Sequence, residues 1–203
     1  MGSWKGSKCL KEMSRKGQNV LYLNISLPSP KAIWLLVHLD GEIKNSFVNY
    51  TVHRCDRDTE IGRKSKCGGI ALLSSPGLLC TLGEKYSNGS CELLITEFGE
   101  LDITFVLIYR PPDSTLGEFK DVLTRVSTHL SSHPTKDTVV AGDFNFPTEI
   151  VEWRNSEEGY IPLPGNCCSD ERKLQFQELL DLSNEYSFIK SLTSPHMAIT
   201  RST

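Results

Sequence analysis

The chain has 203 residues, 38% of them hydrophobic and 23% charged, which fits one domain with a sizeable core. Its formal net charge of −3 excludes a basic field over the whole surface, so nucleic-acid binding needs a local basic patch. The longest apolar run, AIWLLV, is too short to cross a bilayer, and the N-terminus has no apolar signal segment. We therefore expect an intracellular protein, nuclear or cytoplasmic, with no membrane partner and with reduced cysteines.

The N-terminal half of the chain predicts strands. Residues 1–18 are polar and basic, and we expect them to form a disordered lead to a domain over 19–203. Residues 31–40, KAIWLLVHLD, fit either a short helix or a buried strand, because periodicity does not separate the two. Alternating or glycine-led apolar runs predict further strands at 19–27, 47–54 and 68–75.

The C-terminal half mixes strands with helices. Residues 91–112 predict two strands joined at FGEL, and residues 137–145 predict another. Apolar residues at a helical spacing over 115–132 predict an amphipathic helix capped by Ser114 or Thr115. An irregular stretch to about Asp170, a second amphipathic helix over 171–187 and an end without a closing element are expected to follow. This order favours a mixed α/β sandwich with helices outside.

The segment VVAGDFNFP, 139–147, carries candidate chemistry at a strand end. Gly142 lets the backbone turn or approach a neighbour closely. Asp143 and Asn145 are two apart, so they share one side of an extended chain. A carboxylate accepts protons or binds metal, and a carboxamide holds water or phosphate without adding charge. Gly-Asp and Asn-x-Pro are also ordinary turn sequences, so this motif alone leaves both interpretations open.

The segment IYRPP, 108–112, ends the preceding strand in a similar way. Tyr109 offers a phenolic donor and Arg110 a permanent cation, and both suit a phosphate. A strand that ends in a proline-rich loop is the structural alternative.

Taken in order, the YRPP and GDFN motifs resemble the endonuclease/exonuclease/phosphatase superfamily. The chain is most similar to the endonuclease domain of non-LTR retrotransposons, the module that precedes their reverse transcriptase. The resemblance runs over roughly Asn19 to Thr193. It includes the stretch YTVHRCDRDTEIGRKSKCGGIALL, whose matching residues are Tyr50, Arg54, Asp56, Arg57, Gly68 and Gly69.

The resemblance implies a four-layered α/β sandwich of the endonuclease/exonuclease/phosphatase type, truncated at the C-terminus, and an ancestral magnesium-dependent hydrolysis of DNA phosphodiester bonds. By motif match, Asp143 orients or deprotonates water, and Asn145 and Tyr109 hold the phosphate. Asp143 and Asn145 serve as the metal ligands, Arg110 and Asn24 contact the substrate, and no small-molecule cofactor is implied besides Mg²⁺.

Two departures from the family pattern bear on activity. Leu36 stands where the family has its metal-binding glutamate, and leucine offers no oxygen to a hard cation. The final Ser-Asp-His motif has no match, and we set His196 aside because no Ser-Asp precedes it.

We therefore expect a degenerate endonuclease that nicks DNA very slowly or not at all. Robust magnesium-dependent nicking would instead mean that another carboxylate, such as Asp40 or Glu42, has taken the metal role. A non-catalytic nucleic-acid or protein binding module and a phosphoesterase of another branch remain the alternatives. Weak, salt-sensitive DNA binding is expected through Arg54, Arg57, Arg63, Lys64 and Lys66.

Overall fold

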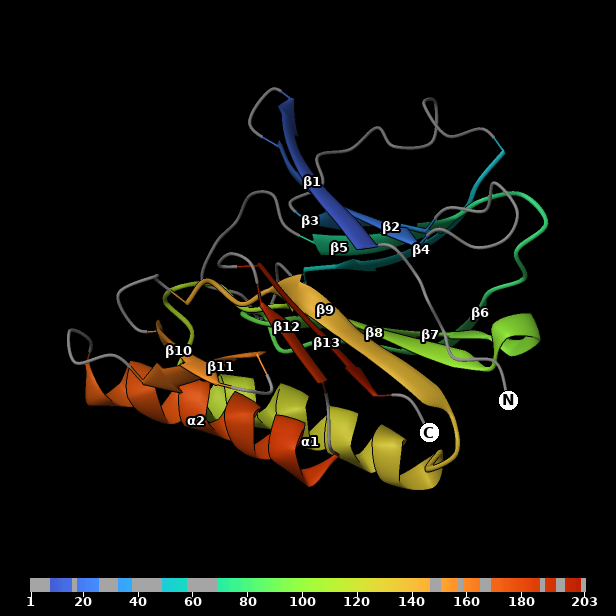
Figure 1. Ribbon diagram of the computed structural model, residues 1–203. Coiled ribbons are helices and arrows are strands. Elements are labelled where there is room, and N and C mark those ends of the chain that lie inside the picture. The colour runs from blue at the N-terminus through green and yellow to red at the C-terminus, as the bar shows by residue number, and fades with distance from the viewer. Residues whose placement is uncertain are drawn as a thin grey trace.

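The computed structural model contains two large sheets, a two-stranded sheet and two α-helices among the residues it describes (Figure 1). Backbone is described at 8–15, 18–25, 33–37, 49–57, 69–146, 151–156, 159–164, 169–186, 189–192 and 196–201. Side chains are described at 49–57, 69–146 and 169–186.

The first sheet has five antiparallel strands in the order β1-β2-β3-β5-β4. Their bounds are β1 Lys8–Arg15, β2 Gln18–Ile25, β3 Ile33–Val37, β4 Thr51–Asp56 and β5 Gly69–Ser74. The expected strands are present within a few residues, and the ambiguous segment 31–40 contains a strand. The structure differs from the expected disordered lead at β1, which pairs with β2 along its full length. Backbone ladder bonds form there although the side chains are largely polar.

The second sheet has six strands in the order β12-β13-β9-β8-β7-β6. Their bounds are β6 Thr81–Ser87, β7 Glu92–Phe98, β8 Ile103–Tyr109, β9 Asp137–Asp143, β12 Ile189–Leu192 and β13 His196–Arg201. The β8 and β9 strands pair in parallel, and the other pairs are antiparallel. A short 3₁₀ turn, η1 Gly99–Leu101, joins β7 to β8 and confirms the hairpin expected at FGEL.

Three parts of the chain differ from the sequence predictions. The strands β12 and β13 follow α2, and β13 covers the edge of β9, where no closing element was expected. The pair β10 Val151–Ser156 and β11 Gly159–Pro164 lies in the stretch expected to be irregular. The strand β6 was not anticipated. Each is a run of four to seven residues, too short for a clear periodic signal, so pairing decides its conformation.

The two large sheets pack face to face, and both α-helices cover the outer face of the six-stranded sheet (Figure 1). One core cluster, which includes Ile70, Leu72, Phe105 and Leu107, lies between the sheets. The other lies under α1 Leu116–Ser132 and α2 Asp170–Glu185. The α/β class is confirmed. Within the described residues the layers are sheet, sheet and helices, and these residues do not show the fourth layer of the expected sandwich.

The helix α1 follows the sequence prediction closely. Thr115 is its N-cap and forms a capping box with Glu118, which decides between the two candidate caps. The predicted apolar stripe is buried at Phe119, Val122, Leu123, Val126 and Leu130. This stripe fixes which face of α1 meets the sheet.

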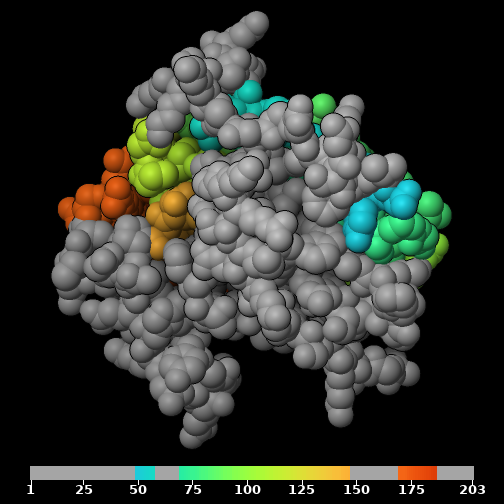
Figure 2. Space-filling view, turned by 90° about the horizontal axis from the view of Figure 1, so that it is seen from above, coloured from blue at the N-terminus to red at the C-terminus, as the bar shows by residue number. Residues whose placement is uncertain are grey.

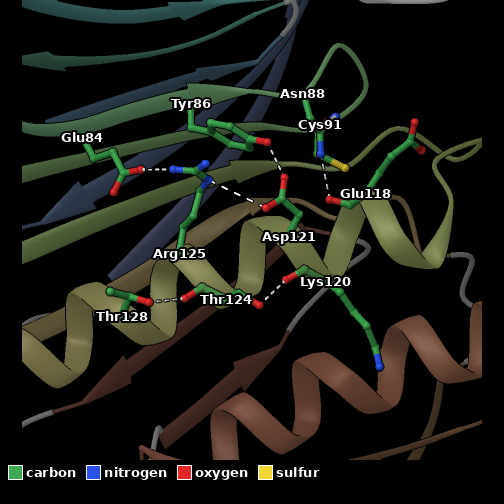
Figure 3. A network of polar contacts seen from close by, with 10 residues as sticks. All are labelled: Glu84, Tyr86, Asn88, Cys91, Glu118, Lys120, Asp121, Thr124, Arg125 and Thr128. Atoms are coloured by element: carbon green, nitrogen blue, oxygen red, sulfur yellow. Dashed lines mark hydrogen bonds and ion pairs between the residues drawn. The ribbon is translucent and has the colours of Figure 1, made fainter.

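A polar network attaches the other side of α1 to β6 (Figure 3). Tyr86 donates to Asp121, and the Arg125 guanidinium lies 3.6 Å from the centre of the Tyr86 ring. Arg125 also donates to Glu84 at 3.0 Å. A cation over an aromatic face and an ion pair each add a modest stabilisation at a partly exposed position. The network orients α1 over the outermost described strand of the sheet.

Gly142 is required by the close approach of β8 and β9. A Cβ atom built on Gly142 would lie 1.8 Å from the carbonyl oxygen of Ile108, which is backbone that cannot turn away. Ile108 and Gly142 are partners in the parallel register. The sequence expectation of a close backbone approach at this glycine is therefore confirmed.

We expect Gly142→Ala to destabilise the fold by about 3 kcal/mol, the upper part of the range for overpacking. For a chain of this size, that lowers Tm by roughly 6–12 °C. Gly117→Ala is the matched control, because a Cβ there meets nothing within 4 Å and alanine suits the helix. Equal melting temperatures for the two variants would contradict the close approach.

Candidate functional site

Tyr109 and Asp143 meet where two parallel strands end. They are the last register pair of β8 and β9, and the Arg110 N–H extends the ladder to the Asp143 carbonyl oxygen at 2.9 Å. Side chains alternate along a strand, so both point toward the first sheet, where Tyr109 belongs to the core between the sheets. Tyr109 is 4% exposed and Asp143 is 3% exposed.

The segments that follow these strands remain close together. Seen from above in Figure 2, the described residues after β8 and those after β9 lie side by side, next to the start of α2. The side-chain amide nitrogen of Asn145, Nδ2, donates to the Arg110 carbonyl oxygen at 2.9 Å. This bond attaches Asn145 to the residue that follows β8.

The backbone conformation of Asn145 and one hydrogen bond define the loop that follows β9. Its φ of 46° lies in the left-handed region, which asparagine tolerates better than most residues. Its backbone N–H donates to Asp143 Oδ1 at 3.0 Å. This bond orients the Asp143 carboxylate.

The register extends this pair to a row across four strands. Glu92 of β7 lies opposite Tyr109, and His196 of β13 lies opposite Asp143. We call Glu92, Tyr109, Asp143 and His196 the cross-strand row. The side chain of His196 falls outside the described residues, so only its register position is used here. Sequence reasoning missed both outer members, because register is visible only once the strands are paired.

Arg57 lies against this row from the end of β4. Its Nε donates to Glu92 Oε1 at 2.6 Å, and its guanidinium carbon lies 5.4 Å from the centre of the Tyr109 ring. Both charged side chains are buried, Arg57 with 6% and Glu92 with none of its surface exposed. Arg57 Nη2 and Glu92 Oε2 are buried without a hydrogen-bond partner among the described residues.

Burial and neighbouring charges have opposing effects on the pKa values of Glu92, Arg57 and Tyr109. Burial raises the pKa of Glu92 to about 6, although the hydrogen bond and charge of Arg57 oppose the shift. Burial disfavours the charge on Arg57, but the hydrogen bond and charge of Glu92 outweigh it and raise its pKa. Burial also raises the pKa of Tyr109 to about 12, against the effect of Arg57. Tyr109 is therefore a protonated donor at neutral pH.

Arg110, expected to contact phosphate, lies on the helix side of the sheet and is fully buried. It donates to the carbonyl oxygens of Phe144 at 2.6 Å and Asn145 at 2.9 Å, and to Gln175 at 2.9 Å. Its guanidinium also lies 4.4 Å from the centre of the Phe146 ring. Burial lowers its pKa to about 10, so it stays charged at neutral pH. These contacts hold the loop after β9 in place.

The remaining predicted residues are only partly described. Asn24 lies in β2 opposite Cys9, and Leu36 lies in β3 between Val20 and Ala71, with side chains outside the described residues. In the expected basic patch, Arg54 pairs with Asp56 at 2.7 Å and Arg57 with Glu92. The positions Arg63, Lys64, Lys66, Asp40 and Glu42 fall outside the described residues.

Comparisons with known proteins gave structural similarities only. No protein-family model and no curated protein sequence matches the chain. Among solved structures, truncated TDP2 of Caenorhabditis elegans is 12% identical with a TM-score of 0.41, covering 83% of this chain and 82% of that one. An endonuclease/exonuclease/phosphatase family protein of Bacteroides thetaiotaomicron is 10% identical with a TM-score of 0.34, covering 77% and 76%.

The human Nocturnin catalytic domain, solved with bound sulfate, is 14% identical with a TM-score of 0.38, covering 56% of this chain and 51% of that domain. Because every TM-score is below 0.5, we base no functional argument on these similarities. Within the described part of the chain, neither α-helix has the length and apolarity that crossing a membrane requires.

We expect the raised pKa of Glu92 to make stability fall as pH rises from 4.5 toward 6. The folded state binds the Glu92 proton more tightly than the unfolded chain does. The contribution of this proton to stability is therefore fully present below pH 4.5 and is lost as the pH rises to about 6. A shift from 4.5 to about 6 corresponds to ~2 kcal/mol. Urea unfolding at several pH values should show this slope, and Glu92→Gln should remove it.

Glu178→Gln, at a half-exposed position on α2, is the control and should keep the slope. An identical pH dependence in the wild type and in Glu92→Gln would show that Glu92 titrates normally.

Proposed function

We propose that the chain is a phosphodiester hydrolase acting on nucleic acid, specifically a retrotransposon-type DNA endonuclease with a low turnover. The observation that carries this proposal is the register pairing of Tyr109 with Asp143 at the ends of β8 and β9. The Asn145 side chain also bonds from the segment after β9 to the Arg110 carbonyl oxygen after β8. Paired strand ends bring a donor, a carboxylate and a carboxamide together without needing a long loop.

The described residues suit a weakly held magnesium ion. Asp143 supplies carboxylate oxygen, and the Oδ1 of Asn145 has no hydrogen bond from a described residue. Both are hard oxygen ligands of the kind that Mg²⁺ prefers. Glu92 is a poor third ligand, because its Oε1 is already bound to Arg57. When bound, the ion would stabilise negative charge on the phosphate.

Each residue of the site has a role that its surroundings support. Asp143, fixed by the Asn145 N–H, is placed to accept a proton from the attacking water. Tyr109 keeps its proton and can donate to a phosphate oxygen as negative charge builds. Arg57, with its buried Nη2 unpartnered among the described residues, takes the phosphate-binding role that the sequence gave to Arg110. Arg110 instead positions the loop that carries Asn145.

His196 is a candidate for the missing histidine. The sequence gives no Ser-Asp-His motif, yet β13 places His196 opposite Asp143 in register. A histidine beside the catalytic carboxylate suits a general base or a stabiliser of the transition state. We propose this role from the register position alone.

A non-catalytic binding module is the second candidate. Leu36 stands at the family's glutamate position, and Tyr109 and Asp143 are almost wholly buried, which limits access of a phosphate to them. On this alternative the same surface binds nucleic acid without cleaving it.

We expect slow nicking of supercoiled plasmid with magnesium and none with chelator. Asp143→Ala should reduce the rate by about 10²–10⁴-fold, as loss of a general base does. Tyr109→Phe should reduce it by up to about 10³-fold, through loss of one donor to the developing charge. Asp137→Ala at the opposite end of β9 and Tyr86→Phe on the helix side are the matched controls and should nick normally.

Nicking that survives Asp143→Ala would mean that the hydrolase proposal has the wrong site. Salt-sensitive DNA binding with no nicking by the wild type would instead support the binding module.

We expect Leu36→Glu to tighten magnesium binding and to raise the nicking rate. The new carboxylate would supply an oxygen ligand at the position where the family resemblance has one. Leu36→Gln, which has the same length but no carboxylate, is the matched control. Magnesium titrations that do not separate the two variants would show that β3 is out of register with the family pattern.

A further inference from the structure

A second cluster of ligand-type side chains lies at the opposite end of the six-stranded sheet. Glu97 of β7, His129 in the last turn of α1 and His133 at its C-cap each place a ligand atom within 4.8 Å of the others. Glu97 is five residues along β7 from Glu92, which separates the cluster from the cross-strand row by about 17 Å. None of these residues serves the proposed hydrolase.

The two histidines approach one carboxylate oxygen symmetrically. The Nε2 atoms of His129 and His133 both lie 3.9 Å from Glu97 Oε1. Two ligand atoms bound at about 2.1 Å to one zinc ion are at most about 4.2 Å apart. The gap is therefore close to the span of a coordinated ion and too long for a direct hydrogen bond. The two rings are stacked with centroids 4.4 Å apart, so they would have to turn out of this stack to aim both lone pairs at one ion.

The bonds around the cluster orient these ligand atoms. His133 Nδ1 lies 3.0 Å from the carbonyl oxygen of His129, which only accepts, so Nδ1 carries a proton and Nε2 is the nitrogen left to bind an ion. Lys136 Nζ binds the other oxygen of Glu97, Oε2, at 2.6 Å and leaves Oε1 toward the histidines. Hydrogen-bonded histidines and carboxylates of this kind are typical of metal ligands.

His129 supplies the second, independent observation. Its side chain is 10% exposed, and its buried Nε2 has no hydrogen-bond partner among the described residues. A buried ring nitrogen without a partner costs free energy unless a ligand satisfies it. Burial and the neighbouring His133 also lower the pKa of His129, which favours the neutral ring that binds metal.

We propose that Glu97, His129 and His133 bind one divalent transition-metal ion of the zinc class. Two imidazole nitrogens and one carboxylate oxygen favour zinc over magnesium or calcium, which prefer all-oxygen sites. Water would complete the tetrahedral coordination. The ion would cross-link the end of β7 to the last turn of α1, near where the chain turns into β9 (Figure 1).

The test titrates the full chain with Zn²⁺ against a chromophoric chelator, and with Co²⁺ while its visible absorption is recorded. Wild type should bind one ion that His129→Gln and His133→Gln each lose, with affinity falling at least about 10–100-fold, the loss that removal of an outer partner already causes. His53→Gln is the matched control, because His53 contacts Cys80 elsewhere and should leave this ion bound.

The number of zinc ions bound per chain separates this ion from any ion held by the free thiols at Cys55, Cys80 and Cys91. The histidine variants leave these thiols unchanged. Melting curves in chelator confirm that each variant is folded. A zinc stoichiometry that neither His129→Gln nor His133→Gln lowers by one ion, or no binding by the wild type, would overturn the proposal. Asp143→Ala should still bind zinc, so failure of the hydrolase proposal and failure of this one are distinguishable.

Discussion

The candidate site depends on the parallel contact between β8 and β9. Gly142 allows the two backbones to approach, because any side chain there would overlap the Ile108 carbonyl oxygen. Arg110 then continues the ladder and turns its guanidinium to the helix side, where it bonds the loop after β9 and Gln175 of α2. A buried arginine is tolerated because four acceptors and an aromatic face replace its water. Tyr109, Asp143 and Asn145 take their positions from this arrangement.

The buried pair of Arg57 and Glu92 is the second constraint on the site. Removing two charges from water costs several kcal/mol, and a single short bond at 2.6 Å does not recover all of it. Arg57 Nη2 and Glu92 Oε2 are buried without a hydrogen-bond partner among the described residues, and this accounts for part of the free energy that is not recovered. Such incomplete satisfaction is common where a protein awaits a polar ligand, and a phosphate oxygen would meet the need of Arg57. The pair thus links the end of β4 in one sheet to the cross-strand row of the other.

The sequence predicted what local patterns control and missed what pairing controls. The stripe on α1, its Thr115 cap, the FGEL hairpin and the glycine of GDFN follow from spacing and backbone sterics within a few residues. The strands β12 and β13 are short and stand out only through their partner β9, so neither their presence nor the position of His196 was visible. Arg110 was assigned by charge alone, but the face it occupies follows from strand alternation at the end of β8. Glu92 lacked any motif and gains its place from register with Tyr109.

Strand β7 links the two proposed sites and also keeps them apart. Its alternation directs Glu92 toward the first sheet and Glu97 toward α1, since the residues between them divide between the two core clusters. The two carboxylates therefore differ in surroundings as well as in position. Glu92 is desolvated beside one guanidinium, whereas the hydrogen bond from Lys136 lowers the pKa of Glu97. An ionised carboxylate beside two imidazoles suits a borderline cation, whereas the buried Glu92 carboxylate is occupied by the hydrogen bond from Arg57. One strand thus gives two chemically distinct environments from the same side chain type.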